Sequence, residues 1–586
     1  MLFRSTTLTI LDWAERYVRR LGEASFSLEK VPLNDALAYK LLSAGNTTAV
    51  FQLESRGMRD LIKRARPDRF EDVIALVALY RPGPMDLIPE YIERKHGKRV
   101  EYLDPRLAPI LGPTYGIMVY QEQVMQIAQV IGGYSLGGAD LLRRAMGKKK
   151  PEEMAQQREV FVAGAEKNGL ARTRATQLFD LMEKFAGYGF NKSHAAAYAL
   201  LAYQTAYMKA HHAAAFFAAN LSAVMDDTDK VRPFHEDAVA NGLVILPPDV
   251  NASEYRFVPV DRATIRYGLG AVRGTGESAI NAILEARRAK PFADLFDFCS
   301  RVDKRLVNRR VVEALIRAGA FDSIDPQRAR LLASAGRALE AAEQALAQAS
   351  QESLFGEAEA PRGGAVVYVD AAPWDMRQKL TEEKVALGFY LSGHLFKVYE
   401  RELAGFARVP LAKLSAGERV TMAGIVVAAR TQMTRRGRMM VVMLDDGTAQ
   451  VEISVFNELF EKHREKLKED SLLVVAGKVQ SDEFSGGLRV SADELMDLET
   501  LRNRHASLLR LSLNGQADAK RLQQVLGPYR ASGNGSCQVL VEYENGTALC
   551  KLALGESWRV RPDTRLISEL GAWLAPENVE VVYSSL

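Results

Sequence analysis

Two clusters of basic and polar residues in the first third of the chain have the chemistry needed to bind phosphate groups. In the first, LLRRAMGKKKPEE, five cations fall within eight residues: Arg143, Arg144, Lys148, Lys149 and Lys150. This density of charge gives a strong local positive field. We expect Gly147 to break the helix before the lysines, so that the two groups of cations face one anion from different directions. A solvated basic face is the alternative that charge alone leaves open.

The second cluster is FNKSHAAAYA, residues 190–199, which has the pattern of a helix start. Ser193 is the expected N-cap, and the helix after it offers free N–H groups at its positive end. Lys192 and His194 flank that end, and together these groups could hold a triphosphate or a DNA phosphate. The alternative is a capped helix start with a purely structural role.

A glycine-rich turn occurs in YGLGAVRGTGESAINAIL, residues 267–284. Gly274, Thr275 and Gly276, between a short helix and a helix from Glu277, match the helix-hairpin-helix pattern. We place a second, degenerate copy at NRRVVEALIRAGAFD (308–322). Glycines in such turns let backbone N–H groups approach phosphates, and paired copies grip a duplex backbone without reading bases. A dinucleotide fold is excluded because no βαβ unit surrounds the glycines.

The pentapeptide QESLF begins an acidic, Gly/Pro-containing segment, 351–365, whose composition is typical of an exposed loop. Leu354 and Phe355 are two large apolar residues with no core of their own to fill. We expect them to anchor in a partner's pocket, with Gln351 hydrogen-bonding at its rim. The alternative is a loop tucked against its own domain.

Metal chemistry has little support in the sequence. Asp445-Asp446 is a paired carboxylate, but it precedes Gly447 at a strand end, where a hairpin turn favours Asp and Gly. The eight histidines form no HxH or HExxH pattern, and we interpret His211-His212 as a partner of the negative end of a helix dipole.

Bulk composition sets broader limits. The 586 residues, 47% of them hydrophobic, suffice for about three to five domains. A net charge of +4 does not itself require a nucleic-acid partner. The N-terminus lacks the apolar core of a signal peptide, and the apolar stretch Ala195–Met208 is too short and polar to cross a bilayer. Three cysteines without CxxC spacing fit a reducing cytoplasm: Cys299, Cys537 and Cys550.

The elements that must position these motifs differ along the chain. Residues 14–250 are expected to be mainly helical, because apolar residues recur at helical spacing in Glu71–Tyr80, Gln121–Ile131 and Ser193–His211. A short strand-like run, Tyr255–Val260, begins a section of short helices. An alanine-rich helix follows at 328–350, for which a plain spacer is the simplest interpretation.

The second half changes character. Between 417 and 497 we expect five strands, with a helix at Asn457–Leu467 between the third and the fourth, which is the pattern of an OB-fold barrel. Residues 501–586 mix strands and helices and indicate a small α/β domain. The fold class is therefore multidomain α+β.

In this order, the motifs resemble alpha subunits of bacterial DNA polymerase III, the replicative C-family polymerases, in their proteobacterial form. The resemblance covers nearly the whole chain. It is carried by FQLESRGMRDLI (51–62), ALVALYRPGPM (75–85), PTYGIMVYQEQVMQIAQ (113–129), LRRAMGKKKPEEM (142–154), FNKSHAAAYALLAYQTAYMKAHH (190–212), ILPPDVN (245–251) and LGFYLSGHLF (387–396).

The resemblance implies five sections. Residues 1–13 would be a palm remnant, 14–253 mostly helical fingers, and 254–412 a helix-hairpin-helix and clamp-binding domain. Residues 413–500 would be the OB-fold, and 501–586 the domain that meets the tau subunit of the clamp loader. QESLF resembles the family's clamp-binding pentapeptide.

The resemblance also implies site residues. Nucleotide- and phosphate-binding candidates are Arg81, Tyr120, Gln121, Arg143, Arg144, Lys148, Lys149, Asn191, Lys192, Ser193 and His194. DNA-binding candidates are Gly274, Thr275 and Gly276 in the hairpin and Arg435, Arg436 and Arg438 in the OB domain. Clamp-binding candidates are Gln351, Ser353, Leu354 and Phe355.

The sequence departs from the family at the palm, which supplies three aspartates that bind two catalytic metals. The third precedes a Thr-Leu-Thr segment that matches Thr7-Leu8-Thr9 here, so it would fall near Met1, and Met1–Thr6 diverge. We therefore expect no catalytic residues, no metal ligands and no bound cofactor in this chain, Mg²⁺ only in the complete polymerase, and no activity alone.

The main hypothesis is part of a template-directed DNA polymerase that binds incoming dNTP, primer–template DNA, the sliding clamp (beta) and tau. The alternative is a stand-alone DNA- and clamp-binding adaptor without catalysis. A third hypothesis, an RNA-binding OB protein such as a synthetase appendage, gives no reason for QESLF.

Overall fold

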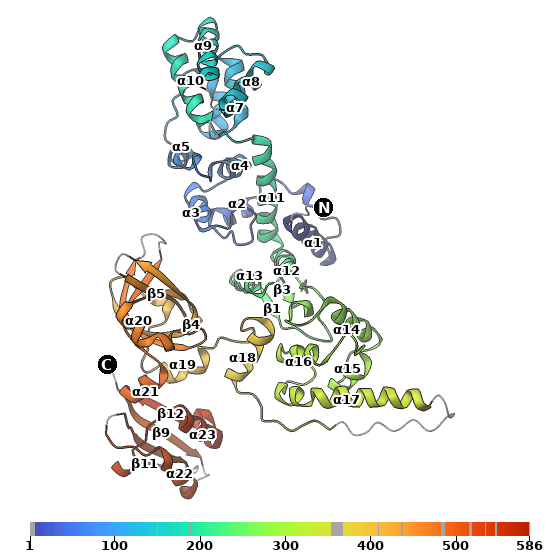
Figure 1. Cartoon of the computed structure of the whole chain (residues 1–586), viewed down its shortest axis with the longest axis vertical. Coiled ribbons are helices and arrows are strands. Elements are labelled where there is room, and N and C mark those ends of the chain that lie inside the picture. Colours follow the sequence, from blue (N-terminus) through green and yellow to red (C-terminus); the bar gives the residue numbers. More distant parts are fainter. Residues whose placement is uncertain are drawn as a thin grey trace. The chain divides into compact units, whose positions relative to one another are not determined.

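The chain forms two compact units in a computed structural model (Figure 1). One comprises Met1–Pro373 with Val385–Phe389, and the other Trp374–Lys384 with Tyr390–Leu586. The structure describes residues 6–148, 151–186, 189–352, 367–407, 409–434, 437–481, 487–514, 518–533, 535–544, 546 and 548–584. None of the helices in these ranges is long and apolar enough to cross a membrane.

The N-terminal part of the first unit is helical, as predicted. Its helices are α1 (Thr6–Arg20), α2 (Ala36–Ser43), α3 (Arg56–Ala65), α4 (Phe70–Leu79), α5 (Ile88–Lys95), α6 (Ala108–Leu111), α7 (Gln121–Val130), α8 (Leu136–Lys148), α9 (Pro151–Lys167), α10 (Arg172–Ala186), α11 (Lys192–His211), α12 (Ala213–Ala223) and α13 (Thr228–Ala240). The three segments predicted from helical spacing are α4, α7 and α11.

Helix α11 organises this part because small residues line one of its faces. Ala195, Ala199, Ala202 and Ala206 recur at intervals of three and four and are buried with Tyr203. Small side chains at this spacing let neighbouring helices approach closely. Figure 1 shows α2 and α4 lying alongside α11, and all three contribute to one core.

Helices α7 to α10, together with Leu107, Leu111 and Met118 of the preceding segment, form a second core, which includes Ile127, Leu142, Phe161, Phe179 and Met182. Helix α8 does not end before the lysines as predicted, because it continues through Gly147 to Lys148. One glycine inside a helix costs only about 1 kcal/mol relative to alanine, so the rest of the helix can carry it.

The first unit continues with a small sheet of order β1-β3-β2: β1 (Val244–Leu246), β2 (Val258–Pro259) and β3 (Thr264–Arg266). Four helices follow: α14 (Glu277–Ala289), α15 (Leu295–Arg301), α16 (Arg309–Arg317) and α17 (Arg328–Glu352). The predicted alanine-rich helix is α17. The range 308–322, predicted as a second hairpin copy, contains only one helix, α16. The helix before it, α15, and the turn at 302–308 lie ahead of that range.

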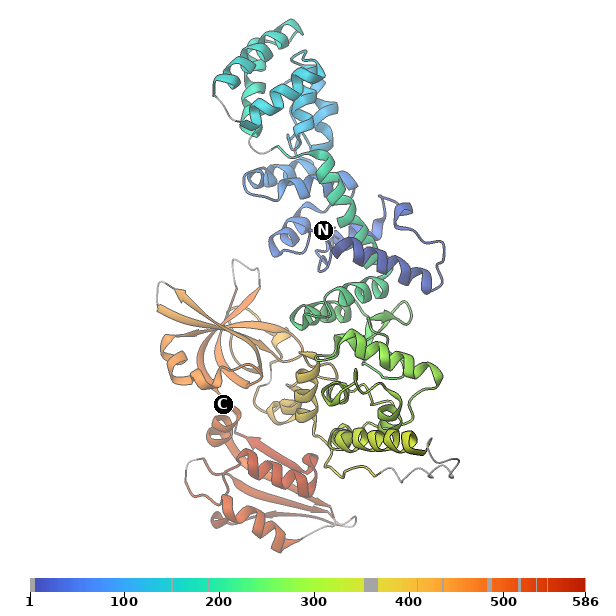
Figure 2. The same cartoon turned by 45° about the vertical axis from the view of Figure 1, so that its right-hand side comes forward.

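The second unit contains the predicted barrel, shown in orange in Figures 1 and 2. Its strands are β4 (Arg419–Thr434), β5 (Gly437–Asp445), β6 (Gln450–Phe456), β7 (Leu472–Ser481) and β8 (Leu488–Met496), closed in the order β4-β5-β6-β8-β7. Helix α20 (Asn457–His463) lies between the third and fourth strands, as expected for an OB-fold.

The carboxylates at 445 and 446 make the turn predicted for them. Gly447 N donates to Asp445 Oδ1 at 2.8 Å, and Thr448 N donates to Asp446 Oδ1 at 2.8 Å. Gly447 has φ 82°, a conformation that favours glycine. Within the described part of the chain, no group of three or more metal-ligating residues is present.

The C-terminal part is a four-stranded sheet of order β11-β10-β9-β12. Its strands are β9 (Ala506–Asn514), β10 (Gln538–Glu544), β11 (Leu549–Ala553) and β12 (Val579–Tyr583), with α22 (Ala519–Leu526) and α23 (Thr564–Leu574). The remaining helices are α18 (Met376–Leu387), α19 (Lys397–Leu403) and α21 (Leu498–His505). The predicted mixture of strands and helices is confirmed.

Candidate phosphate-binding and nucleic-acid-binding sites

The starts of α7 and α11 lie side by side in the first unit, although about 70 residues separate them. The residues that precede them, Tyr120 and Phe190, form a parallel bridge. Gln121 N donates to Phe190 O at 2.9 Å, and Phe190 N donates to Val119 O at 3.2 Å. This short pairing brings the YQEQ and FNKSH motifs together.

Three cations from different elements surround this bridge. The Arg81 guanidinium lies 4.3 Å from the centroid of the Phe190 ring, and Lys192 Nζ lies 5.6 Å from that of Tyr120. Arg143 Nη1 donates to Gln121 Oε1 at 3.3 Å. Burial lowers the pKa of Arg81, but a guanidinium titrates so far above neutral pH that it stays charged. A phosphate here would meet positive charge from three elements.

The predicted residues at this site have different roles. Tyr120 is only 3% exposed, so we interpret its ring as a buried support on which the Lys192 ammonium packs. Gln121 Nε2 donates to Gly189 O at 3.1 Å, which fixes the side chain that Arg143 contacts. Arg144 is paired with Asp140 at 2.9 Å, and Asp140 also binds Arg143 at 2.8 Å. The hydrogen bond from Arg143 holds the pKa of the Asp140 carboxyl below its usual range.

The start of α11 differs from the sequence prediction. Its N-cap is Asn191, whose side chain accepts a hydrogen bond from His194 N at 2.9 Å, and Ser193 is already the second residue of the helix. Glu122 accepts from Asn191 Nδ2 and from Lys192 N, both at 2.9 Å. The helix end therefore already holds a carboxylate, as the helix dipole favours. The side chains around the bridge supply the cationic surface.

An aromatic row along α11 was not predicted. The His194 ring lies 5.5 Å from Phe190 and 4.4 Å from Tyr198, and Tyr198 lies 5.4 Å from Phe51. His194 is exposed and the other three are partly exposed. The i, i+4, i+8 spacing of 190, 194 and 198 was a visible signal. A row of rings beside cations suits the flat face of a nucleobase.

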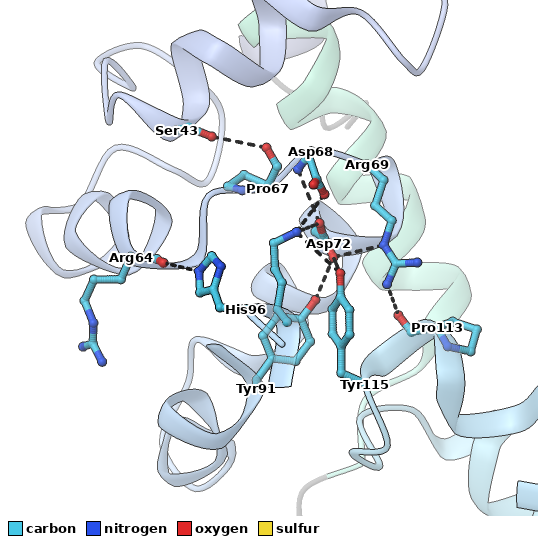
Figure 3. Close-up of polar contacts among 11 residues, drawn as sticks. Ser43, Arg64, Pro67, Asp68, Arg69, Asp72, Tyr91, His96, Pro113 and Tyr115 are labelled. Carbon is cyan, nitrogen blue, oxygen red and sulfur yellow. Dashed lines mark hydrogen bonds and ion pairs between the residues drawn. The ribbon is translucent and has the colours of Figure 1, made fainter. Parts of the chain in front are cut away.

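A buried ion-pair network supports the loop that leads to Tyr120 (Figure 3). Asp72, on α4, accepts from Lys95 Nζ at 2.7 Å, from the Tyr91 hydroxyl at 3.1 Å and from the Tyr115 hydroxyl at 3.0 Å. Arg69 binds the same carboxylate at 3.3 Å and Pro113 O at 3.0 Å. The side chain of Asp72 is 1% exposed, so the network joins α4, α5 and residues 113–115 from within.

The charge state of that network follows from its partners. Burial by itself raises the pKa of the Asp72 carboxyl, but hydrogen bonding and charge from Lys95 outweigh it, and the pKa is held below its usual range. Lys95 has a pKa raised above normal by Asp68 and Asp72, against the effect of its own burial. The pair is therefore ionised at neutral pH.

The predicted hairpin lies between the short helix Leu269–Ala271 and α14. Thr275 closes it, because its hydroxyl donates to Leu269 O at 2.9 Å and to Val272 O at 2.7 Å. Gly274 has φ 83°, whereas Gly276 has φ −92° and ψ 157°, which any residue adopts. A Cβ at either glycine would meet nothing within 4 Å, so this edge of the hairpin is open.

The remaining candidates are placed only in part. Arg438 is exposed on β5 of the barrel. Lys148 and Gln351 lie in α8 and α17, and their side chains are outside the described part of the structure. The others lie outside the described residues altogether: Lys149, Ser353, Leu354, Phe355, Arg435 and Arg436.

Four family models match the chain in consecutive sections. Residues 7–169 match the finger domain of bacterial DNA polymerase III alpha subunits, and 242–331 match a helix-hairpin-helix motif. Residues 420–498 match an OB-fold nucleic acid binding domain, and 521–574 the C-terminal domain of DNA polymerase III subunit alpha. The resemblance stated from the motifs and the multidomain fold class are confirmed.

Curated relatives agree with these sections. The chain is 47% identical over 577 residues to DNA polymerase III subunit alpha of Neisseria meningitidis serogroup B, and 46% identical over 602 residues to that of Escherichia coli K12. Each alignment covers 98% of this chain, and the chain spans about half the length of these relatives, 50% and 52%. Among solved structures, the second OB-fold domain of replication protein A from Methanococcus maripaludis matches 16% of the chain, at 23% identity and a TM-score of 0.14.

Proposed function

We propose that this chain, a relative of bacterial DNA polymerase III alpha subunits along 98% of its length, is the nucleotide-binding and DNA-positioning part of a template-directed DNA polymerase. The observation that carries the proposal is the convergence of Arg81, Arg143 and Lys192 on the bridge between Tyr120 and Phe190. Motifs distant in sequence meet there and form one cationic surface beside a row of rings.

The chemistry of this surface suits an incoming dNTP. A triphosphate needs several cations in fixed positions, because its charge is spread over non-bridging oxygens. Arg81 and Arg143 are each held by a hydrogen bond, to Ala78 O at 3.0 Å and to Gln121 at 3.3 Å, so little side-chain entropy is lost on binding. The row of His194 and Tyr198 offers a stacking surface for the base or for the template.

Replacement of Lys192 by alanine tests this assignment. Lys192 is exposed, so the change should leave the fold intact while it removes one cation from the surface. Loss of one charge-assisted contact should weaken binding of a fluorescent dATP analogue, in the presence of primer–template DNA, about tenfold or more. Lys98→Ala, which removes an exposed lysine paired with Glu93 on the same unit, is the matched control. Equal affinities for both variants would contradict the proposal.

The open hairpin at Gly274–Gly276 and the OB barrel support binding of primer–template DNA, the hairpin on the duplex backbone and the barrel on the single-stranded template.

We further propose that QESLF binds the sliding clamp and that 501–586 binds the tau subunit. Leu354→Ala with Phe355→Ala should remove most clamp binding, since anchors of this kind contribute roughly 2 kcal/mol or more each. If the double variant retains its affinity for the clamp, QESLF no longer supports the polymerase assignment.

Catalysis by the isolated chain is a separate prediction. We expect it to bind primer–template DNA without extending the primer, with or without Mg²⁺, because the resemblance assigns the catalytic aspartates to a preceding segment of the family. A primer-extension assay provides the test, and robust synthesis would contradict the expectation. Binding of DNA and clamp without any binding of nucleotide would instead favour the adaptor.

A further inference from the structure

Apart from the cationic surface described above, the first unit has a cleft that is formed by α1 and α14 together with residues 254–256. Its volume is about 670 Å³, which is within the range of sites that hold a small organic ligand. Trp13, Arg16 and Tyr17 line it from α1 at the i, i+3, i+4 spacing of one helix face. Asn281 and Arg288 line it from α14.

Aromatic rings give the cleft flat apolar surfaces. Trp13 and Tyr255 are partly exposed, and Tyr17 is held in place because its hydroxyl donates to Phe257 O at 2.9 Å. The Arg256 guanidinium lies 4.3 Å from the centroid of the Trp13 ring, and Arg256 is exposed to solvent. A planar base can extend such a stack, on either the ring or the guanidinium.

The charges of the cleft favour an anion. Four arginines line it against two glutamates, Glu254 and Glu277. Arg20 already binds Glu254, at 2.6 Å. Arg287 is committed to the fold, because its Nη1 donates to Val250 O and to Ser253 O at 3.0 and 2.7 Å. The other three arginines remain as cations for a ligand.

Two of these cations have only weak competing partners. Arg16 pairs with Asp12 at 2.9 Å, and Arg288 pairs with Glu285, each within one helix. All four side chains are more than half exposed, at 52% to 77%. Exposed pairs of this kind contribute little to stability, so a phosphate can displace the carboxylate. Arg256 stacks on Trp13 and has no ion-pair partner in the described part of the chain.

We infer that this cleft binds a nucleotide whose base is unpaired, with the base stacked on Trp13 and Arg256 and the phosphate on Arg16 or Arg288. Duplex DNA hides the faces of its bases, so the ligand is either a single strand or a free nucleotide. This inference rests on the proposed function and adds to it a second place where the chain contacts a nucleotide. Helix α14 begins directly after the hairpin at Gly274–Gly276, so the same helix connects the proposed duplex contact with the cleft.

Photo-crosslinking tests the site directly, which matters because the OB barrel offers a second place for single strands. A single-stranded oligonucleotide that contains 5-iodo-deoxyuridine should crosslink to Trp13 or Tyr255, as mapped by mass spectrometry. The double variant Arg256→Ala/Arg288→Ala should reduce that yield about tenfold or more, since it removes both a stacking surface for the base and a cation for the phosphate. Arg262→Ala removes an arginine that is 80% exposed and lies outside the cleft, and should leave the yield unchanged.

Two further measurements separate the outcomes. Competition by excess dTTP would identify a free nucleotide as the ligand, and its failure to compete would identify a strand. Binding of a blunt duplex, measured in parallel, tests the proposed function alone. If duplex binding is intact but neither Trp13 nor Tyr255 is crosslinked, or the yield is the same in the double variant, the inference is wrong and the proposed function stands.

Discussion

At the start of α11, two neighbouring polar residues could each cap the helix, and backbone geometry decides between them. Asn191 has φ −70° and ψ 121°, which is extended, and its side chain reaches His194 N. Ser193 lies inside the helix, where its hydroxyl cannot reach the same group. Both residue types are good N-caps, so composition could not distinguish them. Local pattern therefore located the helix start to within two residues only.

We predict that Asn191→Ala destabilises the first turn of α11 by about 1 kcal/mol, the usual effect of a lost N-cap. Ser193→Ala, two positions away on an exposed site, is the control and should have no measurable effect. Hydrogen exchange of the first α11 amides would report both. Equal effects of the two substitutions would contradict the assignment of the cap.

The Asp72–Lys95 pair allows a second prediction at this scale, because both side chains are almost fully buried, at 1% and 5% exposure. Lys95→Met should destabilise the region by up to about 3–5 kcal/mol at neutral pH, since the buried carboxylate loses its nearer cation and keeps only Arg69, at 3.3 Å. The depressed pKa of Asp72 means that its contribution is present above the unfolded value, about 3.9, and is lost as the pH falls through the folded value.

The destabilisation by Lys95→Met should therefore shrink as the pH falls below about 4, because the stabilisation that the Asp72–Lys95 pair gives the unaltered protein is lost as the pH falls through the depressed folded pKa of Asp72. The stability of α4 and α5 can be measured by hydrogen exchange at increasing urea concentrations, at neutral and at acidic pH. Lys98→Met, at an exposed position, is the control and should show no such dependence. A constant difference across this range would mean that the pair is not the source of the effect.

Among the elements, those with strong local patterns were predictable from the sequence. Apolar spacing located α4, α7 and α11, and strand-like runs located the five strands of the barrel with α20 between the third and fourth. What could not be predicted was pairing at a distance. The bridge between Tyr120 and Phe190 is one residue long on each side, so no local pattern marks it, yet it assembles the candidate site.

The hairpin at Gly274–Gly276 shows how structure separates two reasons for a glycine. Gly274 needs its positive φ for the turn itself. Gly276 has an ordinary backbone conformation and open space where a Cβ would lie, so the fold does not require glycine there. Gly276 is also the N-cap of α14, where glycine is moderately favoured, and close approach of an external backbone, such as that of DNA, is a second reason for it.

We therefore predict that Gly276→Ala leaves the thermal stability of the chain unchanged within about 0.5 kcal/mol but weakens binding of duplex DNA severalfold. Gly274→Ala should instead lower stability by about 1 kcal/mol or more, because alanine is strained at its φ. Fluorescence anisotropy with a labelled duplex and thermal melting distinguish the two. Normal duplex affinity in Gly276→Ala would remove the hairpin as a contact.

For the whole molecule, the division of the chain is not sequential. The first unit ends at Pro373, but Val385–Phe389 returns to it from within the second. Ala386 O accepts a hydrogen bond from Arg273 N at 2.7 Å, and the Phe389 ring lies 5.0 Å from the ring of His235 on α13. The predicted section 254–412 contains this segment, but a return of five residues has no periodicity by which the sequence alone could reveal it.

This return should make Phe389 a stability determinant of the first unit, even though the segments on both sides of Val385–Phe389 belong to the second. Phe389 is 5% exposed, so Phe389→Ala should cost about 3–5 kcal/mol. Faster hydrogen exchange should appear in α13 and around Arg273, and not in the barrel strands β5 and β6.

Burial lowers the pKa of His235 to about 4, so the stability gained from its neutral form is present above its ordinary value of 6.5 and is lost as the pH falls toward 4. Because the variant exposes His235, the loss of unfolding free energy relative to the unaltered protein should be largest above pH 6.5 and smallest near pH 4. Faster hydrogen exchange confined to the barrel strands would contradict the assignment of Phe389 to the first unit.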